Sequence, residues 1–574
     1  MFAQSSRSRR RLQVSVAAAG FALLAAIVEP VAQAVPERSH PTAGEAGSAR
    51  SAAAPRVAAP ATGSVLWKPC RDGFQCASVR VPLDYDNPAG AKIALTVIRH
   101  PAAKPSERIG SLMVNPGGPG GSGVDIVRGI AQFLPLELRS RFDIVGFDPR
   151  GVLRSSPVRC FNTADELYKA LPNFAFPYTP AEEVVQHRYV NTMGAACARH
   201  AGAILAHMST ADAARDMDFL RAALGDAKMN YLGFSYGSVL GQTYANLFPS
   251  KVRALVIDGV DDPRTWVGLG AAGKTVPIGA RLRSDVSAQK TLNEFFRLCD
   301  QSGATGCAVA PNSARRFAVL AGRLRVHPIE VPGWGKLTYA DFVSITLGAM
   351  YATWTWPLLA GLMTDLEQGK PAALGRDLTA LRSRLGVSAR PQEQYDNYVE
   401  ASPAVACSDS NNPASFTAWT STAARSDRLH GYFGRPWTWA WSECATWPKT
   451  AGQDRYVGPW TARTARPVLV VGNYFDPATR YGGALAAAQL LPRSRLLTYA
   501  GWGHTAYMGV GNFCVDSTVT RYLVKVRLPA AGKVCRPEGS PFGPEPAAAI
   551  ADGAAQVITG SSLPTVVRRA LTPR

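Results

Sequence analysis

The chain has 574 residues, 47% of them hydrophobic and 18% charged, and it carries a formal net charge of +20. This length allows more than one ordinary domain and a sizeable buried core. The basic residues are scattered singly outside the extreme N-terminus and form no cluster interleaved with aromatic residues, so no nucleic acid partner is indicated. We interpret the charge as an arginine-rich surface, with weak association to anionic cell-wall polymers as the alternative.

The first 34 residues have the pattern of a signal peptide. Four arginines precede an apolar run from Leu12 to about Val28, and Ala-Gln-Ala at residues 32–34 follows as a cleavage site. The run is too short to span a membrane comfortably, and no later segment is long enough. We therefore expect a protein that is secreted or associated with the cell wall, without stable membrane insertion. Residues 35–62, rich in Ala, Pro, Ser and Arg, predict a flexible segment or pro-segment.

Residues 63–262 alternate strand-like apolar runs with helical patterns. The strand-like runs are Ile93–Ile98, Leu112–Val114, Phe142–Phe147, Tyr231–Leu232 and Leu255–Ile257. A helix is predicted from Thr210 to Leu224, because Ser209 and Asp212 have the spacing of a capping box. Strands that alternate with helices favour right-handed crossovers and a mostly parallel sheet covered on both faces. We therefore predict the α/β class.

Gly-Phe-Ser-Tyr-Gly at residues 233–237 has the form Gly-x-Ser-x-Gly and stands where an apolar run meets a run of small residues. At a strand-to-helix junction this motif is a nucleophile elbow, in which a strained turn holds the serine Oγ clear of the sheet. The two glycines are needed because the strand and the helix pass too closely to admit a Cβ. Ser235 is therefore the predicted nucleophile.

Acyl transfer on Ser235 also requires hydrogen-bond donors for the developing oxyanion. The backbone amide of Tyr236, directly after the serine, is one predicted donor. The second is expected from the glycine-rich run at residues 115–123, where Gly118 is preferred and Gly117 is the alternative. The run is not a phosphate-binding loop, because no Gly-Lys-[Ser/Thr] follows and the spacing is not Gly-x-Gly-x-x-Gly.

Residues 263–464 break the alternation of strands and helices. This stretch holds most of the tryptophans and predicts helices joined by aromatic loops. Because it lies between two parts of one sheet, we predict a cap over the C-terminal edge of the sheet, where open α/β sheets bind their ligands. An independent domain with its own partner is the alternative.

Residues 465–535 resume the alternation, with strand-like runs at Pro467–Val471 and Arg495–Tyr499. A serine nucleophile needs an adjacent base, which in elbow hydrolases is a histidine late in the chain. Two of the three histidines after the elbow, His327 and His430, fall in the predicted cap. His504 lies just past a strand on a glycine-rich loop, so it is the predicted base.

A carboxylate is expected to hold the histidine in the correct tautomer. Asp476 ends an apolar strand one strand before the predicted base, and it is the predicted acid. Asp258, at the end of an earlier strand, is the alternative. Asp148 in Phe-Asp-Pro-Arg-Gly is expected instead to organise a loop by pairing with Arg150. Beyond about Arg536 the chain is rich in Pro, Gly and Ala, and residues 536–574 predict a flexible tail.

Ten cysteines fit an exported protein. Their number is even, they include no Cys-x-x-Cys, and their spacings match no common zinc pattern. Pairing them in sequential order gives five short loops that each stay within one segment. We therefore predict five sequential disulfides and neither a metal nor an organic cofactor.

Four elements occur in a specific order: Asn-Pro-Gly-Gly-Pro-Gly, Phe-Asp-Pro-Arg-Gly, the elbow, and the aspartate–histidine pair. In this combination the sequence resembles the secreted tripeptidyl aminopeptidases, α/β-hydrolases related to proline iminopeptidases, with their TAP-like C-terminal region. The resemblance extends from about Trp67 to Cys535. It implies an α/β-hydrolase fold with an inserted, largely helical cap, and a triad of Ser235, Asp476 and His504.

The resemblance also implies an activity, the release of short peptides, often tripeptides, from a free N-terminus. Two departures from the family pattern bear on substrate preference. Leu153 stands where such proteins usually carry glycine, and Trp502 stands where a small or acidic residue is commoner. Both are expected beside the active site.

An exopeptidase must hold the α-ammonium of its peptide substrate, most simply with a carboxylate of the cap. Asp409, two residues after Cys407, and Glu443, directly before Cys444, are the candidates, because a disulfide there would make both rigid. Two other functions stay open. A secreted esterase or lipase would use the same triad, and a wall-binding protein would keep the scaffold without catalysis.

Overall fold

The computed structural model describes residues 65–387, 395–448, 452, 454–543 and 553–573. The predicted signal peptide (residues 1–34) and the predicted flexible segment (residues 35–62) lie outside the described residues. The cores of both predicted sheet regions lie within the described residues, as does the stretch between them except for residues 388–394, 449–451 and 453.

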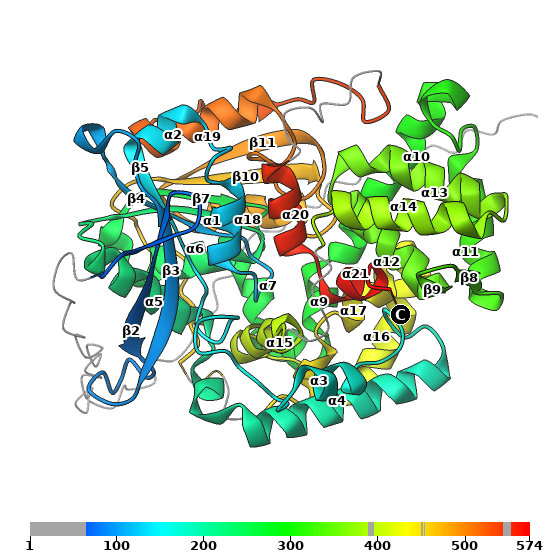
Figure 1. Ribbon diagram of the computed structural model, residues 1–574, viewed down its shortest axis with the longest axis horizontal. Coiled ribbons are helices and arrows are strands. Elements are labelled where there is room, and N and C mark those ends of the chain that lie inside the picture. The colour runs from blue at the N-terminus through cyan, green and yellow to red at the C-terminus, as the bar shows by residue number, and fades with distance from the viewer. Residues whose placement is uncertain (1–64, 388–394, 449–451, 453, 544–552, 574) are drawn as a thin grey trace, which may run out of the picture. The chain divides into compact units, whose positions relative to one another are not determined.

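A ten-stranded sheet carries the functional residues, in the order β1-β2-β3-β5-β4-β6-β7-β10-β11-β12 (Figure 1). The pairs among β1, β2, β3 and β5 are antiparallel, and every pair from β5 to β12 is parallel. The prediction of a mostly parallel sheet is therefore confirmed. The strands are β1 (Lys68–Cys70), β2 (Phe74–Pro82), β3 (Lys92–His100), β4 (Gly110–Asn115), β5 (Phe142–Phe147), β6 (Met229–Phe234), β7 (Val252–Asp258), β10 (Val468–Phe475), β11 (Ser494–Trp502) and β12 (Val534–Cys535).

Helices cover both faces of this sheet, because the central strands are apolar on both sides. In β6, Tyr231 packs into one hydrophobic cluster, whereas Leu232 and Phe234 pack into the other. One face is covered by α1 (Gly123–Ile130), α2 (Leu136–Arg141), α19 (Phe513–Lys525) and α20 (Ala554–Ser562), and the other by α5 (Thr210–Ala223), α6 (Tyr236–Leu247) and α18 (Tyr481–Leu490). Ser209 caps α5 by accepting a hydrogen bond from the amide of Asp212, as its spacing predicts.

A largely helical segment lies between β7 and β10, in the part of the chain where the cap is predicted. Its helices α10 to α14 are on the right of Figure 1, opposite the sheet. The elements are α7 (Pro263–Val267), α8 (Gly270–Thr275), α9 (Ile278–Leu282), α10 (Ser284–Gly306), α11 (Ser313–Val326), β8 (Ile329–Val331), β9 (Gly335–Leu337), α12 (Tyr339–Met350), α13 (Trp356–Glu367), α14 (Pro371–Arg384), α15 (Tyr398–Asp409), α16 (Phe416–His430) and α17 (Gly434–Trp439). Short 3-10 helices are η1 (Pro105–Glu107), η2 (Gly202–His207), η3 (Pro249–Lys251), η4 (Thr353–Thr355), η5 (Gly431–Phe433) and η6 (Ser442–Ala445).

Two further parts of the chain pack against the inserted helices. One is α4 (Pro180–His200), which follows α3 (Ala164–Ala170) and lies along the lower edge of Figure 1. On α4, Tyr189 donates a hydrogen bond to Glu443 at 2.8 Å, and Glu183 pairs with Arg435 at 2.8 Å. The segment before the elbow therefore contributes to the same helical layer.

The C-terminus is the second such part. Residues 536–574 predict a flexible tail, but α20 packs against α1, and α21 (Thr565–Ala570) packs against α12. Ile558 and Val567 are almost completely buried. The prediction of a flexible tail is therefore wrong for residues 553–573. The Pro, Gly and Ala content suggested a loop, but these residues also contain an apolar pattern with helical spacing.

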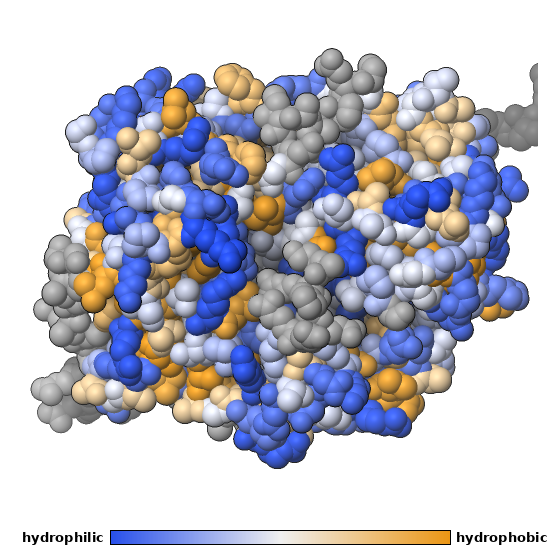
Figure 2. All heavy atoms as spheres, in the orientation of Figure 1, coloured by the Kyte–Doolittle hydropathy of each residue, from blue (hydrophilic) through white to orange (hydrophobic). Residues whose placement is uncertain are grey.

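All five predicted disulfides are present, and they are sequential: Cys70–Cys76, Cys160–Cys197, Cys299–Cys307, Cys407–Cys444 and Cys514–Cys535. On the face shown in Figure 2, hydrophobic residues are interspersed among hydrophilic ones. Within the described ranges, no helix has the length and apolar character needed to cross a membrane.

Candidate active site

Ser235 lies between β6 and α6, at the strand-to-helix junction that its motif predicts. Its backbone has φ of 57° and ψ of −125°, a conformation that L-residues rarely adopt. A Cβ on Gly233 would lie 2.4 Å from the carbonyl oxygen of Gly237, so only glycine fits there. The close approach of strand and helix therefore fixes the serine in its turn.

The carboxylate of Asp476 and the imidazole of His504 form a hydrogen-bonded pair. Nδ1 of His504 lies 2.9 Å and 3.0 Å from the two carboxylate oxygens. The carboxylate is held in turn by the amides of Ala478 and Thr479, at 2.8 Å and 2.9 Å, and by the Thr479 hydroxyl at 2.9 Å. Because Nδ1 must carry the proton toward the carboxylate, Nε2 is left as the acceptor. Nε2 is buried and makes no hydrogen bond within the described part of the chain.

Asp258, the alternative acid, lies next to this pair but contacts the backbone. Its carboxylate accepts hydrogen bonds from the amides of Ala506 at 2.9 Å and Tyr507 at 2.7 Å. Burial raises the pKa of Asp258 to about 7, and the two amides partly oppose this rise. The geometry favours Asp476 as the acid, because Asp476 is the carboxylate hydrogen-bonded to the imidazole.

The glycine-rich run contains the two candidates for the second oxyanion donor, the backbone amides of Gly117 and Gly118. A Cβ on Gly117 would lie 2.4 Å from the carbonyl oxygen of Phe234, so the run packs directly on the elbow. The amide of Gly117 is occupied, because it donates to Oδ1 of Asn115 at 3.0 Å. The amides of Gly118 and Tyr236 donate to no acceptor among the described residues, and both residues line the pocket. This difference favours Gly118 over Gly117 as the oxyanion donor.

A cavity opens at Ser235. Its lining includes four aromatic residues of the inserted segment: Trp266, Tyr351, Trp437 and Trp441. The cavity is also lined by Thr479 of the Asp476 loop, by Asp261, and by Ser562 and Pro564 of the C-terminal segment.

The inserted helices also contact the His504 loop directly. The carbonyl oxygen of Tyr351 accepts a hydrogen bond from the backbone amide of His504 at 2.9 Å. The two rings pack edge to face, with centroids 4.8 Å apart. Trp502 donates from its indole nitrogen to Glu294 at 2.9 Å. Trp502, one of the two departures from the family pattern, therefore anchors the histidine loop to α10.

The two predicted ammonium-binding carboxylates do not line the cavity. Asp409 accepts hydrogen bonds from the amide of Thr210 at 2.8 Å and the indole of Trp266 at 2.9 Å, and burial raises its pKa to about 6. Glu443 accepts from Tyr189, and burial raises its pKa as well. Both carboxylates are hydrogen-bonded to other parts of the chain, so their geometry does not support the prediction that they bind substrate.

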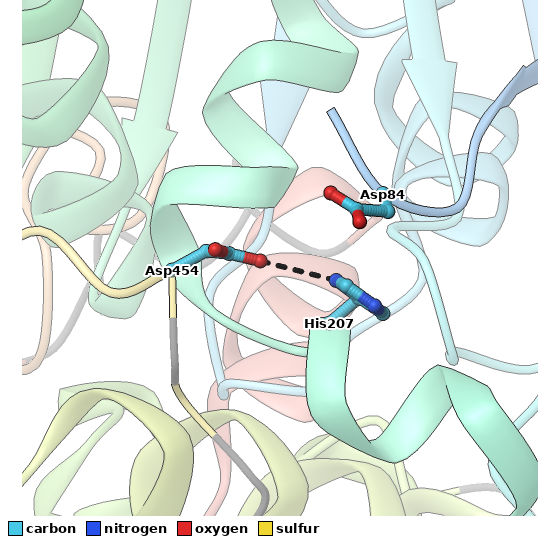
Figure 3. Close-up of side chains that lie close together, drawn as sticks. All are labelled: Asp84, His207 and Asp454. Atoms are coloured by element: carbon cyan, nitrogen blue, oxygen red, sulfur yellow. Dashed lines mark hydrogen bonds and ion pairs between the residues drawn. The ribbon is translucent and has the colours of Figure 1, made fainter. Parts of the chain in front are cut away.

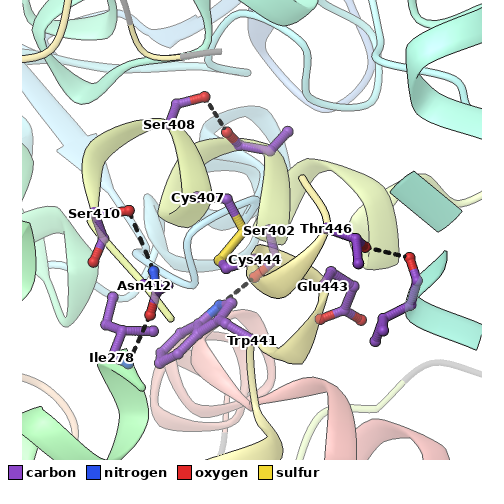
Figure 4. Close-up of a disulfide and its surroundings, with 12 residues drawn as sticks. Ile278, Ser402, Cys407, Ser408, Ser410, Asn412, Trp441, Glu443, Cys444 and Thr446 are labelled. Atoms are coloured by element: carbon purple, nitrogen blue, oxygen red, sulfur yellow. Dashed lines mark hydrogen bonds between the residues drawn. A yellow bond between two sulfur atoms is a disulfide. The ribbon is translucent and has the colours of Figure 1, made fainter. Parts of the chain in front are cut away.

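The disulfide beside these carboxylates joins two elements next to the cavity. Cys407–Cys444 joins α15 to η6 next to Trp441 (Figure 4). The indole nitrogen of Trp441 donates to the hydroxyl of Ser402 on α15 at 3.2 Å. The disulfide therefore supports an aromatic wall of the cavity.

The predicted pairing of Asp148 with Arg150 is wrong. Arg150 forms a buried pair with Asp216, with nitrogen–oxygen distances of 2.7 Å and 2.8 Å. Asp148 instead binds the Ser122 hydroxyl and Arg154, at 3.0 Å from the guanidinium. Leu153, the other departure from the family pattern, has a positive φ of 40°, which explains why glycine suits this position.

One cluster outside the cavity has the residue types of a metal site. Ligand atoms of Asp84, His207 and Asp454 lie within 4.8 Å of one another. Figure 3 shows the imidazole of His207 facing Asp454, to which it is hydrogen-bonded at 3.1 Å. None of the three lines the cavity at Ser235. The cluster therefore takes no part in the chemistry at the serine.

Comparison with known proteins agrees with this architecture. Residues 110–274 match the family described as alpha/beta hydrolase fold, and residues 430–535 match the family described as TAP-like protein. The chain is 33% identical to serine protease Hip1 of Mycobacterium tuberculosis over 84% of this chain and 92% of that protein. It is 31% identical to tripeptidyl aminopeptidase of Streptomyces lividans over 85% and 90% of the two chains. It is 34% identical to carboxylesterase B of Mycobacterium tuberculosis over 88% and 96%. The predicted α/β-hydrolase fold is confirmed.

Proposed function

The chain belongs to the α/β-hydrolase family that includes tripeptidyl aminopeptidase and serine protease Hip1, and on this premise we propose a secreted serine exopeptidase that releases short peptides, chiefly tripeptides, from free N-termini. The observation that supports the proposal most is the hydrogen-bonded pair of Asp476 and His504, since Thr479, which also holds the Asp476 carboxylate, lines the cavity together with Ser235 in its strained elbow. The export of the protein is proposed from its signal-peptide pattern and its five disulfides.

In the proposed reaction, Oγ of Ser235 attacks the scissile carbonyl carbon while Nε2 of His504 takes the hydroxyl proton. Asp476 keeps the proton of Nδ1 in place and stabilises the imidazolium that forms. The amides of Tyr236 and Gly118 donate to the carbonyl oxygen as it becomes negative, each worth about 3–4 kcal/mol of transition-state stabilisation. Backbone donors suit this role because the elbow and the glycine-rich run hold them fixed.

The tetrahedral intermediate then collapses. The carbon–nitrogen bond breaks, His504 gives its proton to the leaving amine, and an acyl-enzyme remains on Ser235. Water attacks the acyl carbon while His504 takes a proton from it and returns a proton to Oγ. The short peptide leaves as a carboxylic acid, and the enzyme is regenerated.

A carboxylesterase is the second candidate. The 34% identity to carboxylesterase B favours it, and the same acyl-enzyme chemistry hydrolyses esters. The aromatic walls of the cavity suit an acyl chain as well as apolar side chains of a peptide. The two functions differ in the substrate that is turned over, not in the triad.

A fluorophosphonate probe and two substrates test these proposals. The probe should label the purified protein and not the Ser235→Ala variant; an unlabelled wild type would favour a non-catalytic, wall-binding protein. Ala-Ala-Pro-p-nitroanilide should be cleaved with a higher kcat/KM than its N-acetylated form. Turnover of a p-nitrophenyl ester without cleavage of either anilide would instead establish the esterase.

A further inference from the structure

Asp261 is the acidic residue among those that line the cavity at Ser235. It follows β7 by three residues and is 8% exposed. Its backbone is pinned to α6, because its amide donates to Ser238 at 3.3 Å and its carbonyl oxygen accepts from Gln242 at 3.1 Å. Both partners lie within two turns of the nucleophile, so the position of Asp261 relative to Ser235 is fixed.

The carboxylate of Asp261 has no partner of its own. Within the described part of the chain, the hydrogen bonds of Asp261 are those of its backbone, and its carboxylate oxygens are not among the fully enclosed polar atoms that lack a partner, so they keep contact with the solvent of the cavity. Burial is the main cause that raises its pKa, to about 7. The negative charges of Asp476 and Asp262 also raise the pKa of Asp261, whereas His504 and Arg480 lower it.

A buried carboxylate without a partner destabilises a fold unless a ligand supplies the missing charge. Every other carboxylate near the site is occupied, Asp476 by His504, Asp258 by two backbone amides, and Asp409 by Thr210 and Trp266. Asp261, which has no such partner among the described residues, lines the cavity where a substrate would lie. Its ligand should therefore be a cation with hydrogen-bond donors.

We propose that the carboxylate of Asp261 binds the α-ammonium group of the peptide substrate. This rests on the function proposed above, in which the acyl carbon of the substrate is at Ser235. A tripeptide spans about 10 Å when extended, and Asp261 and Ser235 line the same cavity. The aromatic residues of the lining lower the local dielectric and so strengthen the charge pair. A capped or internal peptide segment lacks the ammonium group and would leave the carboxylate unpaired.

The test compares two variants on two substrates. Asp261→Asn removes the charge and keeps the shape. Asp262→Asn is the matched control, because Asp262 caps α7, pairs with Arg264 and does not line the cavity. The substrates are Ala-Ala-Pro-p-nitroanilide and its desamino analogue, in which propionyl replaces the first alanine.

The readout is the ratio of kcat/KM for the free peptide to that for the desamino peptide. In Asp261→Asn this ratio should fall about 100-fold, the loss expected when one partner of a buried charge pair is removed. In Asp262→Asn the ratio should equal that of the wild type. Thermal unfolding shows whether each variant is folded, and Asp261→Ser provides a second removal of the charge.

Two results would overturn the assignment. An unchanged ratio in both Asp261 variants would show that another group binds the ammonium, and equal losses on both substrates would show that Asp261 acts on the triad. If Asp261 instead bound the ammonium group of a lysine side chain, Asp261→Asn would lose the preference for a substrate with lysine before the scissile bond, while the ratio defined above stayed unchanged. That result would also contradict the assignment. Failure of the proposed function is distinct, because the wild type would then cleave neither anilide.

Discussion

The backbone carbonyl of Asp258 accepts a hydrogen bond from the backbone amide of Ser235, with nitrogen and oxygen 2.8 Å apart. The carboxylate of the same residue accepts from the amides of Ala506 and Tyr507, directly after His504. One residue at the end of β7 therefore links the turn that holds the serine to the loop that holds the histidine. Asp258 therefore positions the serine turn and the histidine loop, whereas Asp476 is hydrogen-bonded to the imidazole of His504.

Asparagine substitutions should separate these two roles. Asp476→Asn should lower kcat by about 10⁴-fold, because an amide cannot hold the required tautomer of His504. Asp258→Asn should lower kcat by only about tenfold, the effect of about 1 kcal/mol from a weakened hydrogen bond. Steady-state kinetics on the anilide measures both. A larger loss for Asp258→Asn would make Asp258 the acid of the triad.

Tyr351 should matter through its ring rather than its hydroxyl. Tyr351→Ala removes the ring that packs on His504 and should lower kcat/KM by about 100-fold, as displacement of a catalytic group by about 1 Å does. The cavity left behind should also lower the free energy of unfolding by about 3–5 kcal/mol. Tyr351→Phe, which keeps the ring, is the control. Equal losses in the two variants would place the effect in the hydroxyl.

Deleting residues 553–574 should impair both stability and activity. The deletion removes α20, which packs on α1, and the residues Ser562 and Pro564 of the cavity wall. It also removes the carbonyl of Leu563, which accepts from the Tyr398 hydroxyl at 3.0 Å. We expect a lower thermal midpoint and a kcat/KM reduced about tenfold or more. A chain that ends at Leu571 keeps both helices and should behave as the full chain; wild-type kinetics in the longer deletion would contradict the prediction.

The stability of the protein should depend on pH through Asp261. The pKa of this carboxyl is about 7 in the folded protein, above its unfolded value of about 3.9. Between these values the folded protein holds a proton that the unfolded chain has released, so raising the pH favours unfolding until about pH 7. The stabilisation by Asp261→Asn should therefore be larger at pH 8 than at pH 4, by at least about 1 kcal/mol. Urea unfolding of the wild type and the variant measures this stabilisation at each pH. An equal stabilisation at pH 4 and pH 8 would contradict the raised pKa.

The sequence predicts the parts of the site that depend on local geometry. A strained serine between two glycines, an aspartate at the end of β10 and a histidine past β11 are each set by the chain around them. The strands were also predictable, since β4 to β7 are apolar on both faces. Sequential disulfides followed from short spacing within single segments.

The parts that depend on contacts between distant segments were not predictable. Arg150 pairs with Asp216, 66 residues away, rather than with Asp148 two residues before it. Asp409 points to Thr210 and not into the cavity. Asp261 could have been found by the rule that ligands bind at the C-terminal ends of parallel strands, because it closely follows β7. Its burial without a partner is visible only in three dimensions.

Ser562 and Pro564 line the cavity together with residues of the sheet loops and of the inserted segment. The cavity wall is therefore built from stretches of chain that are far apart in the sequence, whereas Asp476 and His504 are paired within one short stretch. Local loosening of α20 and α21 would then remove part of the wall and leave that pair intact. Substrate binding should consequently be lost before the sheet unfolds.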